Sequence, residues 1–321
     1  MRQFILPIIF GIGLILAPGI CAESPLTPQK APNLFLTNGF DLSRIKINSQ
    51  SLSLNFGEGH AVDEEILEEY RALKQDSLTK KTSKFQWALR RLDTGDVVAK
   101  SRDAHRNFYG ASVTKVFVAG AYLNQKVDRV SKRDIVALAK MIAVSDNEAW
   151  KNIQLRLGDG NHQDGMRAVQ NFLFDLGIKK TQGYRGWLGK VHGNETNSLD
   201  LTMFLHRTYV GDYEGAMDMW VLLKTCRTGS SKGAYYLPKS LELGGKTGTY
   251  SGPTVHPLKK KSYYAAVHHH LMSFSWQGKP YGLSVLTDRG RDSDVAILTA
   301  GLLEEYLKVP LLKRPVGDRV E

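Results

Sequence analysis

The fold is decided by residues 108–123, which read Phe-Tyr-Gly-Ala-Ser-Val-Thr-Lys-Val-Phe-Val-Ala-Gly-Ala-Tyr-Leu. Ser112 stands just before an apolar run that begins at Val116 and is typical of a buried helix. Lys115 follows three residues later, so along a helix its side chain points to the same face and can reach the serine oxygen. An unassisted serine hydroxyl is a poor nucleophile at neutral pH and needs a base in contact with it. The stretch therefore predicts a nucleophile at Ser112 and a base at Lys115.

The pattern Ser-x-x-Lys is weak by itself, because it occurs twice more, at Ser43 to Lys46 and at Ser77 to Lys80. Both of those copies lie in polar, charged stretches, whereas the Ser112 copy opens an apolar helix. Further motifs are needed before Ser112 can be given a function.

Two further motifs follow along the chain, Ser145-Asp146-Asn147 and Lys246-Thr247-Gly248. The first, continued by Glu148, also has the form of a capping box at the start of the next helix, so a purely structural interpretation stays open. The second could end a phosphate-binding loop, but that loop needs a glycine where Ser240 stands and a helix after it. The segment 250–253, Tyr-Ser-Gly-Pro, cannot begin a helix, which excludes nucleotide binding.

Together, the three motifs and their order resemble the signature elements of the class A serine β-lactamases and the penicillin-binding proteins: Ser-x-x-Lys, Ser-Asp-Asn and Lys-Thr-Gly. The resemblance extends from about Asp63 to Leu307 and includes the order of helices and strands. It implies an acyl-enzyme at Ser112 and no metal or organic cofactor. The catalytic residues that it implies are Ser112, Lys115, Ser145 and Lys246, and the substrate-binding residues are Asn147, Thr247, Gly248 and Thr249.

The resemblance also implies a role for each of these residues. Ser145 would relay a proton to the leaving nitrogen, Asn147 would hold the substrate amide, and Lys246 with Thr247 would bind the substrate carboxylate. The backbone N–H groups of Ser112 and Thr249 would form the oxyanion hole, where each donor is worth ~3 kcal/mol. Gly248 would let the strand edge approach the substrate closely.

Lys115 must be neutral to act as a base. The positive end of its helix and a second cation, Lys246, are both expected to push its pKa down.

The pattern of apolar residues predicts an α+β fold. A helix is expected from Asp63, a hairpin over 85–99, further strands over 241–250, 263–276 and 281–287, and a closing helix from Asp294. Between them the chain is helical in pattern, over 116–123, 135–142, 149–157, 166–176, 199–210 and 217–223. This order predicts a β-lactamase/transpeptidase-like architecture. It consists of an antiparallel five-stranded sheet flanked by terminal helices, with an all-helical lobe inserted between the second and third strands.

The N-terminus is typical of a secretory signal peptide, which we expect over residues 1–22. Arg2 precedes an apolar run over 4–16 and the small residue Ala22, and Pro18 argues against lipidation of Cys21. We then expect an irregular arm or a few added strands over 23–61, a catalytic domain over 62–310 and a tail over 311–321. The catalytic domain would comprise a sheet lobe, 62–111 and 236–310, and a helical lobe, 112–235. The protein is expected to be periplasmic or secreted, with no stable membrane span after signal cleavage.

The formal net charge of the chain is +11, which favours anionic partners. The sequence shows no nucleic-acid-binding module, and export would take the protein away from nucleic acid. We expect a monomer, in which Cys226, the one cysteine left after loss of the signal, cannot form an internal disulfide. The residues His268 to His270 alternate across a strand with no Cys or carboxylate placed beside them, so no metal site is expected.

The sequence departs from the class A pattern where that family carries a Glu that activates the deacylating water. The corresponding stretch, residues 178–194, contains no acidic residue. Glu195 and His192 remain as candidate deacylation bases, although Glu195 also fits a capping or loop-bracing role. Loss of a positioned general base costs ~10²–10⁴ in rate, so acylation is expected to proceed while hydrolysis of the acyl-enzyme lags. The segment between Lys115 and Ser145 is also shorter than in class A enzymes, which would open the cleft to a bulky peptidoglycan stem.

These features predict an exported serine hydrolase that is acylated at Ser112 by a small-molecule β-lactam or a peptidoglycan stem peptide. It would cleave the C–N bond of a cyclic amide, as a β-lactamase does, and turn over slowly. The alternatives are a penicillin-binding D-alanyl-D-alanine peptidase or transpeptidase, and a non-turnover sensor of β-lactams or peptidoglycan. An esterase or amidase of the same fold also remains open, because motifs indicate mechanism and not substrate.

Overall fold

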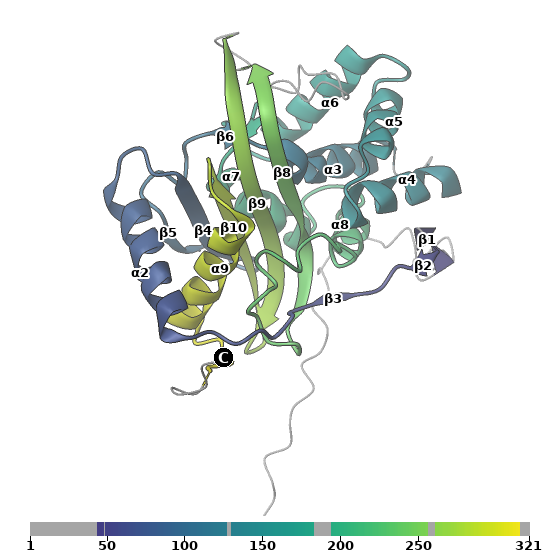
Figure 1. Cartoon of the computed structure of the whole chain (residues 1–321). Helices are drawn as coiled ribbons and strands as arrows, with labels where there is room; N and C mark the ends of the chain where they lie inside the picture. The colour runs from purple at the N-terminus through teal and green to yellow at the C-terminus, as the bar shows by residue number, and fades with distance from the viewer. Residues whose placement is uncertain (1–43, 48, 127–129, 183–193, 256–260, 315–321) are drawn as a thin grey trace, which may run out of the picture.

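The computed structural model describes residues 44–47, 49–126, 130–182, 194–255 and 261–314 (Figure 1). The predicted signal peptide, most of the predicted arm, His192 and the end of the predicted tail lie outside the described residues. Among the helices that are described, none combines the length and the apolar character needed to cross a membrane.

A six-stranded antiparallel sheet forms the centre of the molecule (Figure 1). The prediction of an α+β fold is confirmed, but the strand count of five was wrong by one. The extra strand is a two-residue segment, Asn55–Phe56, which pairs with the edge at Leu243 and Glu242. Two residues are too few to produce an alternating pattern that could be recognised in a sequence. The order is β3 (Asn55–Phe56), β8 (Glu242–Val255), β9 (Ser262–Trp276), β10 (Lys279–Thr287), β4 (Phe85–Arg91) and β5 (Val97–Lys100).

Two helices cover one face of this sheet, α2 (Glu64–Thr79) and α9 (Asp292–Leu307) (Figure 1). The predicted start of α2 is confirmed, because the Asp63 side chain accepts a hydrogen bond from the backbone N–H of Ile66. The closing helix begins two residues before the predicted Asp294, which instead caps it from inside the first turn. The ring of Tyr70 lies where a side chain at Gly301 would project, so the two helices pack at close range.

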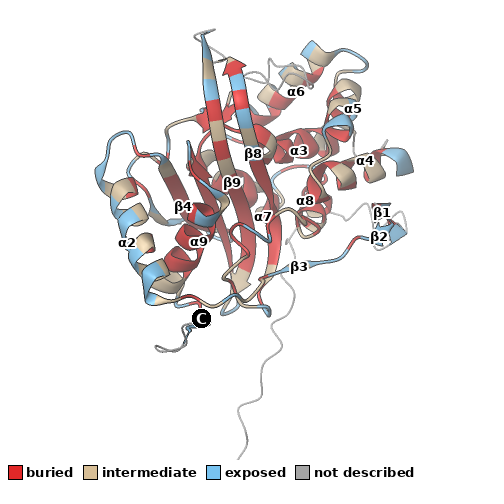
Figure 2. Cartoon of the chain, in the orientation of Figure 1, coloured by how far each residue is buried: buried red, intermediate tan, exposed pale blue. Residues whose placement is uncertain are grey.

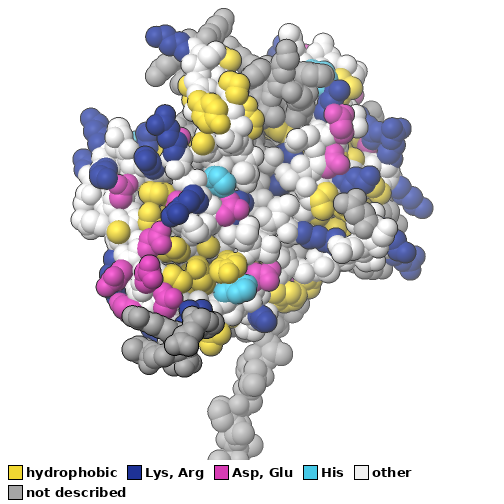
Figure 3. Space-filling view, viewed as in Figure 1, with side chains coloured by type: hydrophobic (Ala, Val, Ile, Leu, Met, Phe, Trp, Pro, Cys, Tyr) yellow, Lys and Arg dark blue, Asp and Glu magenta, His cyan; other side chains and the backbone are white. Residues whose placement is uncertain are grey.

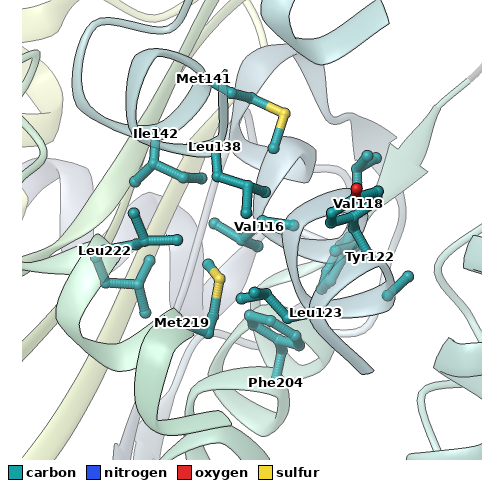
Figure 4. Packing of buried hydrophobic residues seen from close by; sticks show 14 of the residues in the cluster. Val116, Val118, Tyr122, Leu123, Leu138, Met141, Ile142, Phe204, Met219 and Leu222 are labelled. Atoms are coloured by element: carbon teal, nitrogen blue, oxygen red, sulfur yellow. The ribbon is translucent and has the colours of Figure 1, made fainter. Parts of the chain in front are cut away.

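Among the described residues, six helices lie on the other side of the sheet and form the predicted helical lobe. Its centre is α3, which is buried throughout its first nine residues, from Lys115 to Leu123 (Figures 2 and 4). Phe117 packs edge-on against Phe204 of α7, with ring centroids 5.2 Å apart. Burial of each such side chain contributes about 1.5–3 kcal/mol, so this core fixes the position of α3. The helices are α3 (Lys115–Lys126), α4 (Lys132–Ala143), α5 (Asn147–Leu157), α6 (His162–Asp175), α7 (Ser198–Val210) and α8 (Ala216–Leu223).

Two short pairs of strands complete the described part. β1 (Lys46–Ile47) pairs with β2 (Gln50–Ser51), so the described end of the predicted arm contains added strands. β6 (Phe108–Tyr109) pairs with β7 (Glu195–Thr196) and holds the segment before Ser112 against the segment before α7.

β8 and β9 continue well beyond the end of β10 and form a two-stranded hairpin arm (Figure 1). We define the hairpin arm as residues Thr249–Val255 and Ser262–His268. Its base lies at the Lys246-Thr247-Gly248 motif.

Candidate active site

Ser112 lies in a single 3₁₀ turn, Ala111–Thr114, that runs directly into α3. It is partly exposed, whereas its neighbours on both sides are buried. Ala111 adopts a φ of +46°, which a residue with a side chain rarely adopts. Such strain costs on the order of 1–3 kcal/mol and is typical of functional sites. The Ser112 side chain is therefore accessible to solvent, although the helix that begins beside it is buried.

Asn194, which was not predicted from the sequence, holds the Ser112 turn in place by hydrogen bonds. Its side-chain N–H group donates to the Thr114 hydroxyl at 2.8 Å and to the Ala111 carbonyl at 3.3 Å. Its backbone carbonyl accepts from Gly110 at 2.9 Å. No sequence pattern relates positions so far apart, and the contact exists because β6 and β7 pair.

The second motif meets the first at the amine of Lys115. This amine donates to the Ser145 carbonyl at 2.5 Å and to the Asn147 side-chain carbonyl at 2.7 Å, and lies 3.2 Å from the Ser145 hydroxyl. The capping role considered for Ser145 is taken by Asp146, whose carboxylate accepts from the N–H of Ala149. Ser145 itself has a left-handed φ of +62°, which turns its polar atoms toward Lys115.

Lys115 is held in its neutral form. Its side chain is 0% exposed. Burial lowers the pKa of Lys115 to about 6, and the charge of Lys246 acts in the same direction. Burial, which the sequence could not reveal, is thus a larger cause than the cation that was predicted. A neutral amine has two N–H donors, for which Ser145 and Asn147 supply carbonyl acceptors, and one lone pair that remains to accept a proton.

The expected contact between Ser112 and Lys115 is not made. Over the described residues, no hydrogen bond joins the Ser112 hydroxyl to the Lys115 amine, which is turned to Ser145 and Asn147 instead. Catalytic hydrogen bonds are often long in free enzymes and tighten when substrate binds. The hydroxyl that is hydrogen-bonded to the amine is that of Ser145.

The third motif, on β8, packs against the Ser112 turn. A Cβ atom added to Gly248 would lie 2.8 Å from the Val113 nitrogen and 3.3 Å from the Ser112 nitrogen. Lys246 is 0% exposed, and its amine donates to the Thr247 carbonyl at 2.8 Å. Burial lowers the pKa of Lys246 to about 8. The three motifs therefore lie together, with Thr249 exposed at the base of the hairpin arm.

Replacing Gly248 with alanine is expected to reduce acylation of Ser112 by about 10²-fold, since the new methyl group meets backbone atoms that cannot rotate away. Overpacking of this kind also costs about 1–3 kcal/mol of stability. Stopped-flow acylation by a chromogenic cephalosporin measures the first effect, and urea unfolding measures the second. Wild-type acylation in the variant would contradict the close packing of β8 on the turn.

Further polar groups, which were not predicted from the sequence, lie near the third motif. The Thr228 hydroxyl makes a short hydrogen bond with the Thr247 hydroxyl. The buried Lys232 forms an ion pair with Asp292 at the start of α9, and Asp292 also lies 2.5 Å from Nδ1 of His268. These residues come from separate parts of the chain and follow no spacing rule, so only their positions in the fold connect them.

Of the two candidate deacylation bases, Glu195 is described and His192 is not. Glu195 lines a cavity of about 930 Å³ together with Tyr109 and Tyr263, and neither Ser112 nor Lys115 lines that cavity. Burial raises the pKa of Tyr263, and the neighbouring Glu195 raises it further. Asn194 points to the Ser112 turn, so the next residue along the chain faces the opposite way. This position fits a bracing role better than that of a base.

The three consecutive histidines alternate across β9. His269 lies 2.7 Å from the Tyr109 carbonyl, and His270 accepts from the backbone N–H of Gly233 at 3.0 Å. Burial lowers the pKa of His269 to about 4 and that of His270 to about 3, so both rings are neutral packing groups. Within the described ranges, no group of three potential metal ligands comes together.

Solved structures of β-lactamases share the fold. A β-lactamase from Desulfarculus baarsii is 18% identical, with a TM-score of 0.57 and coverage of 76% of this chain and 97% of the other. A mutant of the class A β-lactamase of the last common ancestor of Gram-negative bacteria is 19% identical, with a TM-score of 0.58 and coverage of 75% and 98%. At this identity the likeness shows the fold alone. No curated protein matches the chain.

The sequence profile described as "Beta-lactamase enzyme family" matches residues 128–303, more than half of the 321 residues. This match includes the second and third motifs, and the fold that it implies is the one observed. The chain belongs to the beta-lactamase enzyme family and is a serine hydrolase of the β-lactamase type.

Proposed function

We propose that Ser112 is the nucleophile of an exported hydrolase, acylated by β-lactams or D-alanyl peptides and slow to release the acyl group. The observation that carries the proposal is the neutral, buried Lys115 amine, held by Ser145 and Asn147, three residues along the chain from the partly exposed Ser112. A Ser-x-x-Lys pair needs such a base, because the lysine must accept the serine proton. The proposed catalytic domain spans residues 62–310.

In the proposed acylation, the Ser112 hydroxyl attacks the substrate carbonyl carbon and its proton passes to the Lys115 lone pair, directly or through the Ser145 hydroxyl. The carbonyl oxygen becomes negative and accepts hydrogen bonds from the N–H groups of Ser112 and Thr249. The C–N bond then breaks, and Ser145 gives its proton to the leaving nitrogen and regains one from Lys115. The products are an ester on Ser112 and a neutral Lys115, so every proton that is transferred is accounted for.

Substrate binding is assigned to the base of the hairpin arm. Lys246 and Thr247 would bind a substrate carboxylate, since both are fixed by hydrogen bonds close to the Ser112 turn. The pKa of Lys246, about 8, leaves most of its amine protonated at neutral pH. Asn147 would hold the substrate amide, because its side chain is exposed at the mouth of the site.

Slow deacylation is supported by the position of Glu195, which faces the cavity beside Tyr263 and not Ser112. After mixing with benzylpenicillin, intact mass spectrometry is expected to show a covalent adduct. This adduct should last much longer than one catalytic cycle of an efficient β-lactamase. A return to the free mass within seconds, with ring-opened product, would disprove slow turnover and leave the acylation proposal standing. Absence of an adduct and of product would disprove both.

A D-alanyl-D-alanine peptidase is the second candidate. The hairpin arm favours it, because it adds an exposed surface next to the proposed carboxylate site. Release of D-alanine from an acetylated peptide ending in D-Ala-D-Ala, compared with hydrolysis of benzylpenicillin, distinguishes the two activities.

A further inference from the structure

The proposed acylation places a positive charge on a buried amine. When Lys115 takes the serine proton, an ammonium ion forms in a side chain that is 0% exposed. Burial lowers the pKa of this amine most strongly, the Lys246 charge lowers it further, and the Asp146 carboxylate raises it. The Asp146 carboxylate already accepts the backbone N–H of Ala149, at the start of α5. A further group that stabilises the ammonium form would therefore make Lys115 a better base.

The oxygen atoms that bond to the Lys115 amine belong to uncharged groups. They are the Ser145 carbonyl at 2.5 Å, the Asn147 side-chain carbonyl at 2.7 Å and the Ser145 hydroxyl at 3.2 Å. Over the described residues, no carboxylate forms a salt bridge with this amine. On the molecular face in Figure 3, acidic side chains gather over α2, on the opposite side of the sheet from the helical lobe. A charge on Lys115 therefore has dipoles beside it and no directly paired counter-ion.

The indole ring of Trp150 also faces this amine. The Lys115 nitrogen lies over the ring, 5.1 Å from its centroid. The negative face of an aromatic ring attracts a cation within about 6 Å, and tryptophan does so more strongly than tyrosine or phenylalanine. The attraction grows where water is excluded, and Trp150 is only 3% exposed. A neutral amine gains little from the ring face, so the ring selectively stabilises the ammonium form.

The fold holds the Trp150 ring in place through α5. Trp150 follows Asn147 by three residues on this helix, so the two side chains lie on the same face, and α5 packs against α3. The backbone N–H of Trp150 donates to the Asp146 carbonyl at 3.3 Å. Its side chain belongs to the buried apolar core of the helical lobe. The ring is therefore positioned by the same helix start that positions Asn147.

The indole N–H of Trp150 is an unfavourable feature of the folded protein. It is buried and, in the part of the chain that the structure describes, has no hydrogen-bond acceptor. An unpaired buried donor destabilises the folded state, and phenylalanine or leucine would bury no such group at this position. Stability alone therefore does not favour tryptophan here, which points to a contribution from its ring.

We propose that Trp150 is a positioning residue for catalysis, whose ring face stabilises the ammonium ion that Lys115 becomes during acylation. The inference rests on the proposed function, in which Lys115 is the base. No bond forms or breaks at Trp150, because the proton moves from Ser112 to Lys115 and then to the leaving nitrogen. A base works best when its pKa lies near the operating pH, and the ring offsets part of the effect of burial.

The test incorporates fluorinated tryptophans at position 150 of the whole protein, because fluorine withdraws negative charge from the ring face and nearly conserves the shape of the ring. The measured quantity is the midpoint pH, below which the rate of acylation by benzylpenicillin falls. It should move to lower pH with each added fluorine, by about one unit in total, since the ammonium form of Lys115 becomes less favourable. The maximal acylation rate should fall by about 3–10-fold. The same analogues at Trp276, which donates to the Leu307 carbonyl on the far side of the sheet, should change neither value.

Trp150→Phe and Trp150→Leu form a matched pair of natural variants. Both remove the indole N–H and leave a smaller side chain, but only phenylalanine keeps a ring, so the midpoint pH of the leucine variant should be lower by about half a unit. Should either variant fail to fold, the fluorinated proteins still decide the question. A midpoint pH that fluorination at position 150 leaves unchanged would overturn the role of Trp150 alone. Absence of acylation in the unmodified protein would overturn the proposed function itself.

Discussion

Replacing Ser112 with alanine is expected to abolish the covalent adduct with benzylpenicillin and to reduce turnover of any acyl donor by at least about 10³–10⁴-fold. The reason is chemical, since no acyl-enzyme can form at this position without the hydroxyl. The variant should fold normally, because Ser112 is partly exposed and its side chain makes no hydrogen bond with another described residue. Intact mass spectrometry over time measures the adduct, and peptide mapping of the wild-type adduct locates it.

Ser230→Ala is a suitable control, because Ser230 is an exposed serine outside the three motifs. It should retain the adduct at the wild-type rate. An adduct that survives Ser112→Ala, or one that maps to another serine, would remove the nucleophile from the proposed mechanism.

Replacing Lys115 with methionine is expected to slow acylation by about 10²–10⁴-fold, the usual contribution of a general base. Methionine fills the buried volume but has no lone pair that can take the serine proton. The same residue predicts the pH dependence. Its pKa, lowered to about 6, means that the amine is neutral and active above pH 6 and protonated and inactive below it. The wild-type rate at low substrate concentration should therefore fall about tenfold per pH unit below 6.

The two readouts separate catalysis from structure. In Lys115→Met, acylation should be slow and its rate should no longer fall at acidic pH. Lys100→Met, at an exposed lysine, should keep the wild-type acylation rate and pH profile. Thermal unfolding of both variants shows whether the fold is intact. A Lys115→Met variant with an unchanged acidic limb would assign that limb to another group and would contradict the role of Lys115 as base.

The sequence predicted the local structure well where its periodicity is strong. Residues 116–123 and 135–142 were predicted as helices and lie within α3 and α4, and residues 281–287 were predicted as a strand and lie within β10. Prediction was poorer for Asn55–Phe56, where two residues carry no periodic signal. It was also incomplete for the contacts of Asn194 and Thr228, which link distant segments that no spacing relates.

The sequence by itself determined which residue types are available for the chemistry and in what order, because helix and strand patterns are local and the three motifs are short. Tertiary structure decided the state of Lys115, since loss of contact with water lowers its pKa more than any neighbouring charge does. It also decided that Glu195 lines a cavity that neither Ser112 nor Lys115 lines. Burial, side-chain direction and strand pairing arise between segments far apart in the chain, so no local pattern encodes them.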